Sequence, residues 1–429
     1  MRYFPDTVFH FALLEIIDTP KTSVLAFCFR PASCMRWVCD LFHFLERKFV
    51  RMKFKSKLLP LSIAAAVLAL GAISTAQAED LVVKIGQTGP LSGGDAFAGK
   101  DNENGTRMAV DDINAKKMMV GGKTLKLELV SEDDQCDPKA GVAVAQKMVD
   151  AGIKYVNGPY CSGVAIPASK IYNEGDAILS TVGSNPKVTM GGYKSVFRVI
   201  AGDDLIGTKM AQYAFGPMKA KTAGVIDDRT AFGQGLADEF IKEAKVLGLT
   251  IVGQEYTTKQ STDFNAILTN MKAKNPDVIF YGGYAGQAGP MVKQLKGLGI
   301  KSKLLGGDAI CVTETGKLGG DAVNDTVFCA QGGAILDKVA AGPAFKEAYK
   351  KRFNQDPDAY AASFYDQTMF LATTMAKLGT VDSTKVSAEL HKASYKGIVT
   401  TYAYDDKGNL QKAPITVYGF KAGAPIPLQ

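Results

Sequence analysis

Two serines stand at the ends of short apolar runs that have the pattern of β-strands. Ser162 follows the predicted strand 153–158 and opens a predicted helix, whose free N–H groups and dipole attract an anion such as a carboxylate. Ser184 lies in the irregular segment 180–186, where its hydroxyl can donate to a carboxylate and backbone carbonyls can accept from an ammonium group. Either serine alone is more often a helix cap than a ligand contact. The residues alone therefore leave open whether these serines cap helices or contact a ligand.

Groups for covalent or acid–base catalysis are scarce. Residues 79–429 contain no Trp and one histidine, His391, which weakens any hydrolase mechanism that needs a histidine base. His391 lies beside Glu389 and Lys392 in a predicted helix, and we expect this charged face to be solvated. The sequence offers no nucleophile with a base partner and no cluster of metal ligands. We therefore expect no enzymatic activity, no catalytic residue, no cofactor and no metal ion.

The elements that must position these residues follow an α/β rhythm. Short apolar runs alternate with helical patterns, which is typical of parallel βαβ units. The helical pattern is clear at Leu236, Phe240 and Ala244, which share one face of a helix that we expect to end at Gly248. Two successive doubly wound α/β domains without a flexible linker account for the whole pattern. The predicted strands are residues 81–86, 125–132, 153–158, 222–226, 250–255, 277–281, 303–306 and 415–420.

Four cysteines lie in residues 79–429: Cys136, Cys161, Cys311 and Cys329. In an oxidising compartment an even number of cysteines indicates two disulfides, and the sequence alone allows three pairings. Pairing in chain order closes short loops and keeps each bridge within one predicted domain. We therefore predict Cys136–Cys161 and Cys311–Cys329, each stabilising the fold by a few kcal/mol at most.

The first eighty residues carry a targeting signal. Three lysines precede the apolar run 58–73 and the small residues Ala76-Gln77-Ala78, which is the pattern of a secretory signal peptide over residues 52–78, cleaved after Ala78. The run is shorter than the roughly 20 residues of a membrane span. We interpret residues 1–51 as an extension assigned upstream of a true start at Met52; a genuine extension with its own role is the alternative. A periplasmic product is expected.

The positive charge of the chain belongs largely to this N-terminal part. Residues 1–78 hold ten Lys or Arg and five Asp or Glu, so the net charge of +7 falls to +2 without them. A nearly neutral chain lacks the basic surface of a nucleic-acid binder, and we expect no nucleic-acid partner.

Short motifs spread over residues 79–420 resemble, in order and spacing, those of the leucine/isoleucine/valine-binding proteins. These are type 1 periplasmic binding proteins of ABC transporters. Each motif is weak, but their order across most of the chain makes the resemblance specific. The motifs are Cys136-Asp137-Pro138-Lys139, Ile153-Lys154-Tyr155-Val156, Cys161-Ser162, Pro167-Ala168-Ser169, Asn185-Pro186, residues 232–237 and residues 281–284.

The resemblance implies two Rossmann-like lobes, joined by three crossing hinge segments, that close on a small molecule. Residues 79–202 and 333–402 would form the first lobe, and residues 203–332 and 403–429 the second. It also implies that a monomer captures a branched-chain or similar aliphatic amino acid in the periplasm and delivers it to an inner-membrane ABC permease.

The resemblance also assigns a ligand-binding site. Ser162 and Ser184 would hold the α-carboxylate, and the Val182 carbonyl and Asp308 would receive the α-ammonium group. Tyr160, Phe232, Tyr284 and Tyr360 would line the side-chain pocket, with Phe97 beside them. The sequence departs from the family pattern at four positions, which leaves the side-chain preference open. These are Ser184 for Thr, Asp308 for Glu, Phe232 for Tyr, and Ala98 for an aromatic residue.

Two other functions are compatible with the same fold. The ligand can be another amino acid, a short amide or urea, because the departures lie in the pocket. The protein can also be a ligand-sensing domain for a receptor, which has less support because no transmembrane or signalling segment precedes Gln429.

Overall fold

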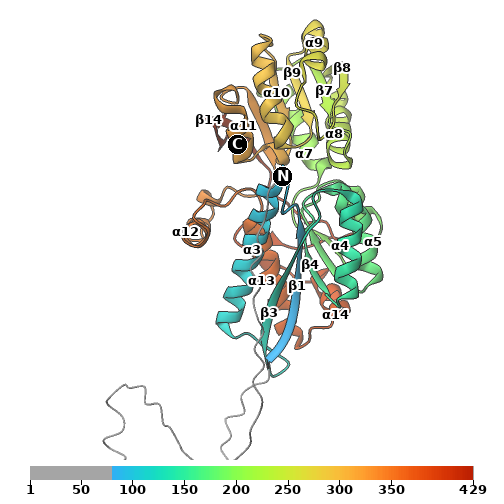
Figure 1. Cartoon of the computed structure of the whole chain (residues 1–429), viewed down its shortest axis with the longest axis vertical. Helices are drawn as coiled ribbons and strands as arrows, with labels where there is room; N and C mark the ends of the chain where they lie inside the picture. The colour runs from blue at the N-terminus through green and yellow to red at the C-terminus, as the bar shows by residue number, and fades with distance from the viewer. Residues whose placement is uncertain (1–79, 429) are drawn as a thin grey trace, which may run out of the picture. The chain divides into compact units, whose positions relative to one another are not determined.

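The computed structural model of the 429-residue chain describes residues 80–428. The predicted signal peptide, its cleavage point and the extension 1–51 lie outside the described residues. Within residues 80–428 there are two large β-sheets, each flanked by helices (Figure 1).

The first sheet has six strands in the order β2-β3-β1-β4-β5-β6. All neighbours pair in parallel except β2 with β3. Helices α4 and α5 pack side by side, and α3 packs along α13 (Figure 1). The strands are β1 (Asp80–Gly89), β2 (Met119–Val120), β3 (Lys123–Asp133), β4 (Tyr155–Asn157), β5 (Ile178–Thr181) and β6 (Val196–Arg198), and the helices are α3 (Ala96–Lys116), α4 (Pro138–Asp150), α5 (Ser162–Glu174), α6 (Lys187–Met190), α13 (Ala361–Leu378) and α14 (Ser383–Leu390).

The second sheet has seven strands in the order β15-β14-β11-β10-β9-β7-β8. The strands from β8 to β11 are parallel, and β14 and β15 add an antiparallel edge. Its strands are β7 (Thr222–Asp227), β8 (Thr250–Tyr256), β9 (Val278–Gly282), β10 (Lys303–Gly306), β11 (Val327–Gln331), β14 (Thr416–Lys421) and β15 (Ala424–Pro427), and its helices are α7 (Asp203–Phe215), α8 (Ala231–Leu247), α9 (Asn265–Lys274), α10 (Ala285–Gly297) and α11 (Thr313–Gly319).

Short elements complete the described chain. They are the helix α12 (Gly342–Phe353), the hairpin strands β12 (Tyr395–Lys396) and β13 (Thr401–Tyr402), and the 3₁₀ turns Asp308–Ile310, Gly320–Ala322 and Leu336–Lys338. The two doubly wound α/β lobes predicted from the sequence are confirmed. The exact lobe boundaries stay a prediction. Asn409, which the prediction assigns to the second lobe, forms a β-bridge with Arg198 at the end of β6 in the first sheet.

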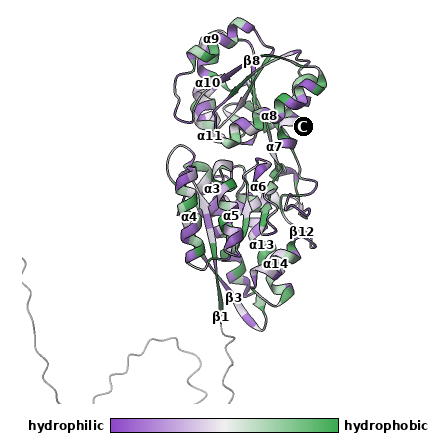
Figure 2. Cartoon of the chain, turned by 90° about the vertical axis from the view of Figure 1, so that its right-hand side faces the viewer, coloured by the Kyte–Doolittle hydropathy of each residue, from purple (hydrophilic) through white to green (hydrophobic). Residues whose placement is uncertain are grey.

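The apolar stripe predicted for residues 236–247 shows how the sequence builds these layers. Leu236, Phe240 and Ala244 of α8 are fully buried, and Phe240 stacks on Phe280 of β9 with ring centroids 4.1 Å apart. Hydrophilic residues alternate with hydrophobic ones along the same helix (Figure 2). The helix ends at Gly248, which adopts the left-handed conformation that the sequence indicated. Within residues 80–428, no helix combines the length and apolarity needed to span a bilayer.

Both predicted disulfides are present. Cys136 is joined to Cys161 and Cys311 to Cys329, with Cα atoms 5.5 and 5.6 Å apart. The first bridge joins the segment before α4 to the residue before α5. The second joins the residue after the 3₁₀ turn Asp308–Ile310 to β11.

Removing either bridge is expected to destabilise the fold. Cys136 and Cys161 are 25 residues apart in the sequence, and Cys311 and Cys329 are 18 apart. Replacing both cysteines of a pair by Ala removes the crosslink that closes the loop between them. Loop-closure entropy predicts a loss of about 3 kcal/mol for either pair, because it changes slowly with loop length. Urea unfolding of the two double variants measures this loss. A midpoint equal to that of the unmodified protein would contradict a stabilising role.

Candidate functional site

Ser162 and Ser184 follow the carboxyl ends of β4 and β5, and this position after strands was predicted. The structure adds that β4 and β5 are neighbouring parallel strands. Ser162 is the first residue of α5 and is buried; its hydroxyl oxygen accepts a hydrogen bond from the backbone N–H of Asn185 at 3.2 Å. Ser184 lies in the loop after β5 and is also buried. Gly183 allows this close approach, because a Cβ atom there would lie 2.8 Å from the Cβ of Ala165. The loop after β5 and the first turn of α5 are therefore in direct contact.

The loop after β5 is held in shape by its own side chains. The Thr181 hydroxyl donates to the carbonyl of Pro159 at 2.8 Å and accepts from the N–H of Gly183 at 2.9 Å. Arg198 donates to the carbonyls of Ser184 and Asn185 at 2.9 and 3.2 Å. Val182 lies buried in this loop. The part that its carbonyl plays in binding stays a prediction.

Asp308 begins the 3₁₀ turn that follows β10 and is 3% exposed. One carboxylate oxygen accepts from the N–H of Ala309 at 2.9 Å, and the other accepts a short hydrogen bond from the Tyr360 hydroxyl. Burial raises the pKa of Asp308 to about 6, although the hydrogen bond from Tyr360 acts in the opposite direction. Burial removes the water that would hydrate the charged Asp308 carboxylate. A cation bound beside it would stabilise that charged form in place of the water.

A second buried acid, Asp203, was missed by the sequence analysis. It begins α7, is completely buried, and neither of its carboxylate oxygens has a hydrogen-bond partner among the described residues. Burial, and next the charge of Asp308, hold the pKa of Asp203 well above its usual range, while the nearby Ser184 and Arg198 act to lower it. An acid at the start of a helix is usually a favourable partner of the helix dipole, so the sequence alone gave no reason to single it out.

Aromatic side chains from both sheets surround these acids. Tyr284, at the start of α10, lies 6.1 Å from Tyr160 and 5.0 Å from Phe232 between ring centroids. Tyr160 precedes α5 of the first sheet, whereas Phe232 lies on α8 of the second. All three are buried, as is Tyr360, and all belong to one hydrophobic cluster. Phe97, in the first turn of α3, is partly buried and packs against the same cluster.

The structure thus brings the predicted side chains into one neighbourhood. The buried charge of Asp308 raises the pKa of both Tyr160 and Tyr360, after burial itself, and Asp203 adds to the effect on Tyr360. Ser162 contacts the residue next to Ser184, and Ser184 adjoins Asp203. The arrangement brings together hydroxyl donors, two buried acids and aromatic side chains. It suits a small molecule with an anionic group, a cationic group and an apolar part.

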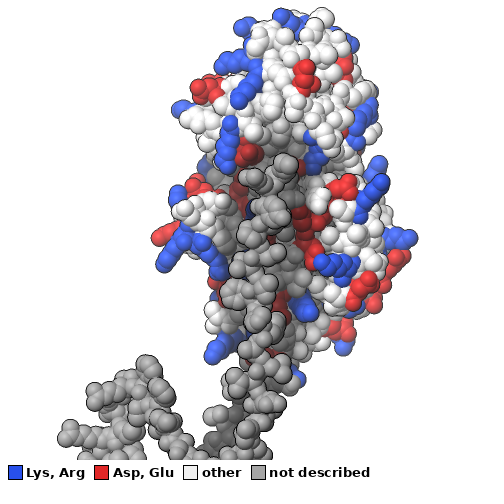
Figure 3. All heavy atoms as spheres, in the orientation of Figure 1, with Lys and Arg blue, Asp and Glu red and all other residues white. Residues whose placement is uncertain are grey.

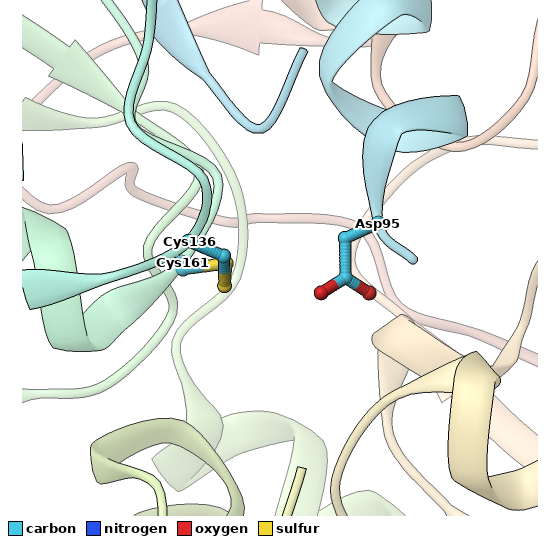
Figure 4. Close-up of side chains that lie close together, drawn as sticks. All are labelled: Asp95, Cys136 and Cys161. Atoms are coloured by element: carbon cyan, nitrogen blue, oxygen red, sulfur yellow. A yellow bond between two sulfur atoms is a disulfide. The ribbon is translucent and has the colours of Figure 1, made fainter. Parts of the chain in front are cut away.

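One group of potential metal ligands lies beside this site. Asp95, just before α3, faces Cys136 and Cys161 (Figure 4), with ligand atoms within 4.8 Å of one another. Both sulfur atoms are already joined in a disulfide, and the Asp95 carboxylate is paired with Lys259. These three residues therefore fit no metal ion in this state.

His391 differs from the solvated residue that the sequence indicated. It lies at the end of α14 and is half-buried, with its ring 4.8 Å from that of Phe197. Its two ring nitrogens lie 3.0 and 2.8 Å from the carbonyl oxygens of Asp405 and Lys194. The packing against Phe197 overrides the polar neighbourhood in the sequence.

Comparison with known proteins identifies relatives over the same span. A family model described as "Periplasmic binding protein" matches residues 82–424. A Leu/Ile/Val-binding protein homologue of Brucella abortus is 32% identical over 362 residues, which cover 84% of this chain and 95% of the relative.

Solved structures agree with this match. The leucine-binding protein of Thermotoga maritima superposes with a TM-score of 0.75 at 25% identity, covering 81% of this chain and 98% of the other. A branched-chain amino acid transporter substrate-binding protein of Streptococcus pneumoniae, solved in complex with isoleucine, gives a TM-score of 0.73 at 25% identity, with 81% and 100% covered.

Proposed function

The chain belongs to the periplasmic binding protein family, and on this premise we propose that it captures a branched-chain or similar aliphatic amino acid between its two lobes and delivers it to the permease of an ABC transporter. The observation that carries the proposal is the pair of buried acids, Asp308 and Asp203, beside the two serine hydroxyls. The names of relatives that bind leucine, isoleucine and valine support it.

The roles of the residues follow from charge. The α-carboxylate of the ligand accepts from the hydroxyls of Ser162 and Ser184 and from N–H groups at the start of α5, which carry a partial positive charge. The α-ammonium group lies between Asp308 and Asp203 and donates to the Val182 carbonyl. The side chain of the ligand contacts the aromatic walls, Tyr160, Phe232, Tyr284 and Tyr360, with Phe97 at their edge.

The protein acts by binding alone. The ligand leaves chemically unchanged, and no catalytic residue or cofactor takes part. The polypeptide is exported by the signal peptide 52–78, cleaved after Ala78, and works in the periplasm as a monomer. Acidic and basic side chains are interspersed on the face of the molecule shown in Figure 3, which suits a soluble carrier with no nucleic-acid partner.

Isothermal titration calorimetry of residues 79–429 tests the proposal. Leucine, isoleucine and valine should bind, whereas 4-methylpentanoate, which lacks the ammonium group, and 3-methylbutylamine, which lacks the carboxylate, should bind far more weakly. Binding of another amino acid, a short amide or urea in place of the three would replace the proposed ligand class. Conversion of the bound amino acid into a product would overturn the proposal of a pure binding protein.

Affinity is expected to depend on pH in one direction. The pKa of Asp308 is raised from 3.8 to about 6 in the ligand-free protein, and an ammonium group favours the charged carboxylate. Affinity should therefore fall as the pH drops through about 6, where binding must displace a proton from Asp308. The raised pKa of Asp203, the second proposed counter-charge, makes affinity fall with decreasing pH in the same direction. The shift at Asp308 also makes the ligand-free protein less stable as pH rises from about 4 to 6, since the folded state holds the extra proton. Calorimetry between pH 4.5 and 8 measures the first effect, and a flat profile would contradict it.

A further inference from the structure

We propose that the Asp95–Lys259 ion pair is a latch that holds the two lobes closed and slows the release of the ligand; the effect on release rests on the proposed function. The two residues are far apart in the sequence and belong to different lobes. Asp95 immediately precedes α3, which packs on the first sheet, and Lys259 lies between β8 and α9 of the second. Any opening between the lobes at this point must separate them.

The pair is close and largely shielded from water. The Lys259 Nζ lies 2.5 Å from a carboxylate oxygen of Asp95, and the side chains are 20% and 7% exposed. The other ion pairs identified among the described residues lie within one helix or short segment or join elements of one lobe, and each has a more exposed lysine or arginine. An example is Lys147–Glu132, at 2.7 Å, in which the lysine is 66% exposed. A shielded pair is weakened less by water and salt than an exposed one.

Each partner is held in place by its own lobe. The Asp95 side chain makes no capping hydrogen bond to α3, although its backbone carbonyl accepts from Ala98 and Gly99 at 3.0 and 3.3 Å. Its carboxylate is therefore available to Lys259. On the other side, the Gln287 side chain of α10 donates to the Lys259 backbone carbonyl. The backbones of Asp95 and Lys259 are thus each held by hydrogen bonds within their own lobe.

The latch also contacts the wall of the binding site. The Lys259 Nζ lies 4.7 Å from the ring centroid of Tyr284, whose other neighbours are Tyr160 and Phe232. A cavity of about 240 Å³ is lined by Asp95 and Lys259, together with residues of both lobes. Closure of the pair therefore fixes an aromatic wall of the pocket at the same time, through a cation–π contact.

Two further buried acids reinforce the position of Lys259. Asp134 follows β3 of the first lobe, and Asp228 follows β7 of the second; each has one carboxylate oxygen without a hydrogen-bond partner. Burial raises the pKa of each to about 6, and the charge of Lys259 acts to lower it. Loss of Lys259 would therefore leave more than one acid without its cation, so its removal should matter more than that of Asp95.

A double-mutant cycle tests the latch. Asp95→Asn, Lys259→Met and the double variant are compared by calorimetry with leucine and by stopped-flow measurement of release, using tyrosine fluorescence. Each single variant should release leucine about tenfold faster, with Lys259→Met at least as fast as Asp95→Asn. The double variant should be no faster than Lys259→Met, because the pair is already broken. Lys147→Met, which breaks an ion pair within one lobe, should change nothing. Independent, multiplying effects or unchanged release would overturn the latch.

A second measurement separates this inference from the proposed function. Small-angle scattering of the ligand-free proteins, after thermal unfolding has shown each to be folded, reports the lobe opening directly. Both single variants should be more open than the unmodified protein and the Lys147→Met control. Failure of every amino acid to bind would overturn the proposed function but leave this comparison intact. Ligand-free variants as closed as the unmodified protein would overturn the latch even where leucine binds.

Discussion

Asp308→Ala is expected to weaken leucine binding by about 3 kcal/mol, which is more than a hundredfold in Kd. Asp308 is 3% exposed and its carboxylate is fixed by Ala309 and Tyr360, so in the proposed complex it would pair with the ammonium group without competing water. Without the Asp308 carboxylate, the desolvated ammonium group would keep only Asp203 as its counter-charge. Calorimetry with leucine at pH 7.5 measures the loss.

Two companion variants show whether the loss comes from charge. Asp308→Asn keeps the size of the side chain and removes its charge, so it should lose nearly as much affinity as Asp308→Ala. Tyr360→Phe removes the hydrogen bond to Asp308 and keeps the aromatic wall, so its loss should be smaller. Leucine affinity unchanged in Asp308→Ala would rule out the assigned role.

Asp203→Asn is expected to act on stability and affinity in opposite directions. In the ligand-free protein, Asp203 is a buried acid whose oxygens lack hydrogen-bond partners and which lies near the charge of Asp308. A neutral side chain there relieves that cost, so the melting temperature of the ligand-free protein should rise by a few degrees, equivalent to about 1 kcal/mol. The bound ammonium group loses a counter-charge, so leucine affinity should fall by about tenfold or more.

Asp204→Asn is the matched control. Asp204 is the next residue of α7 and is only partly buried. It should leave leucine affinity close to that of the unmodified protein. A fall in both stability and affinity in Asp203→Asn would indicate a structural role for Asp203 and would remove it from the binding site.

Local patterns predicted much of the fold. The strand predicted at 303–306 is β10, and the predicted start of a helix at Ser162 is the first residue of α5. Alternating buried strands and amphipathic helices leave a strong trace in sequence, because each element must bury its own apolar face. The disulfides were predictable because both close short loops within one part of the chain.

Contacts between distant segments were not predictable from these patterns. Nothing near Asp203 in the sequence shows that Asp308 will be buried close to it, and nothing near Lys259 indicates Asp95 as its partner. The bridge from Asn409 to Arg198 likewise depends on where the chain returns after α14. Such pairs are set by how the sheets and their connections pack, and an acid in the first turn of a helix looks the same in sequence whether it is solvated or buried.

A crystal structure of residues 79–429 with bound leucine tests the central claim most directly. The ligand nitrogen should lie within hydrogen-bond distance of carboxylate oxygens of Asp308 and Asp203, and the ligand carboxylate should accept from the hydroxyls of Ser162 and Ser184. Leucine bound in the opposite orientation, or in a place that none of these four side chains reaches, would contradict the claim that two buried acids and two serines recognise the two charged ends of one amino acid.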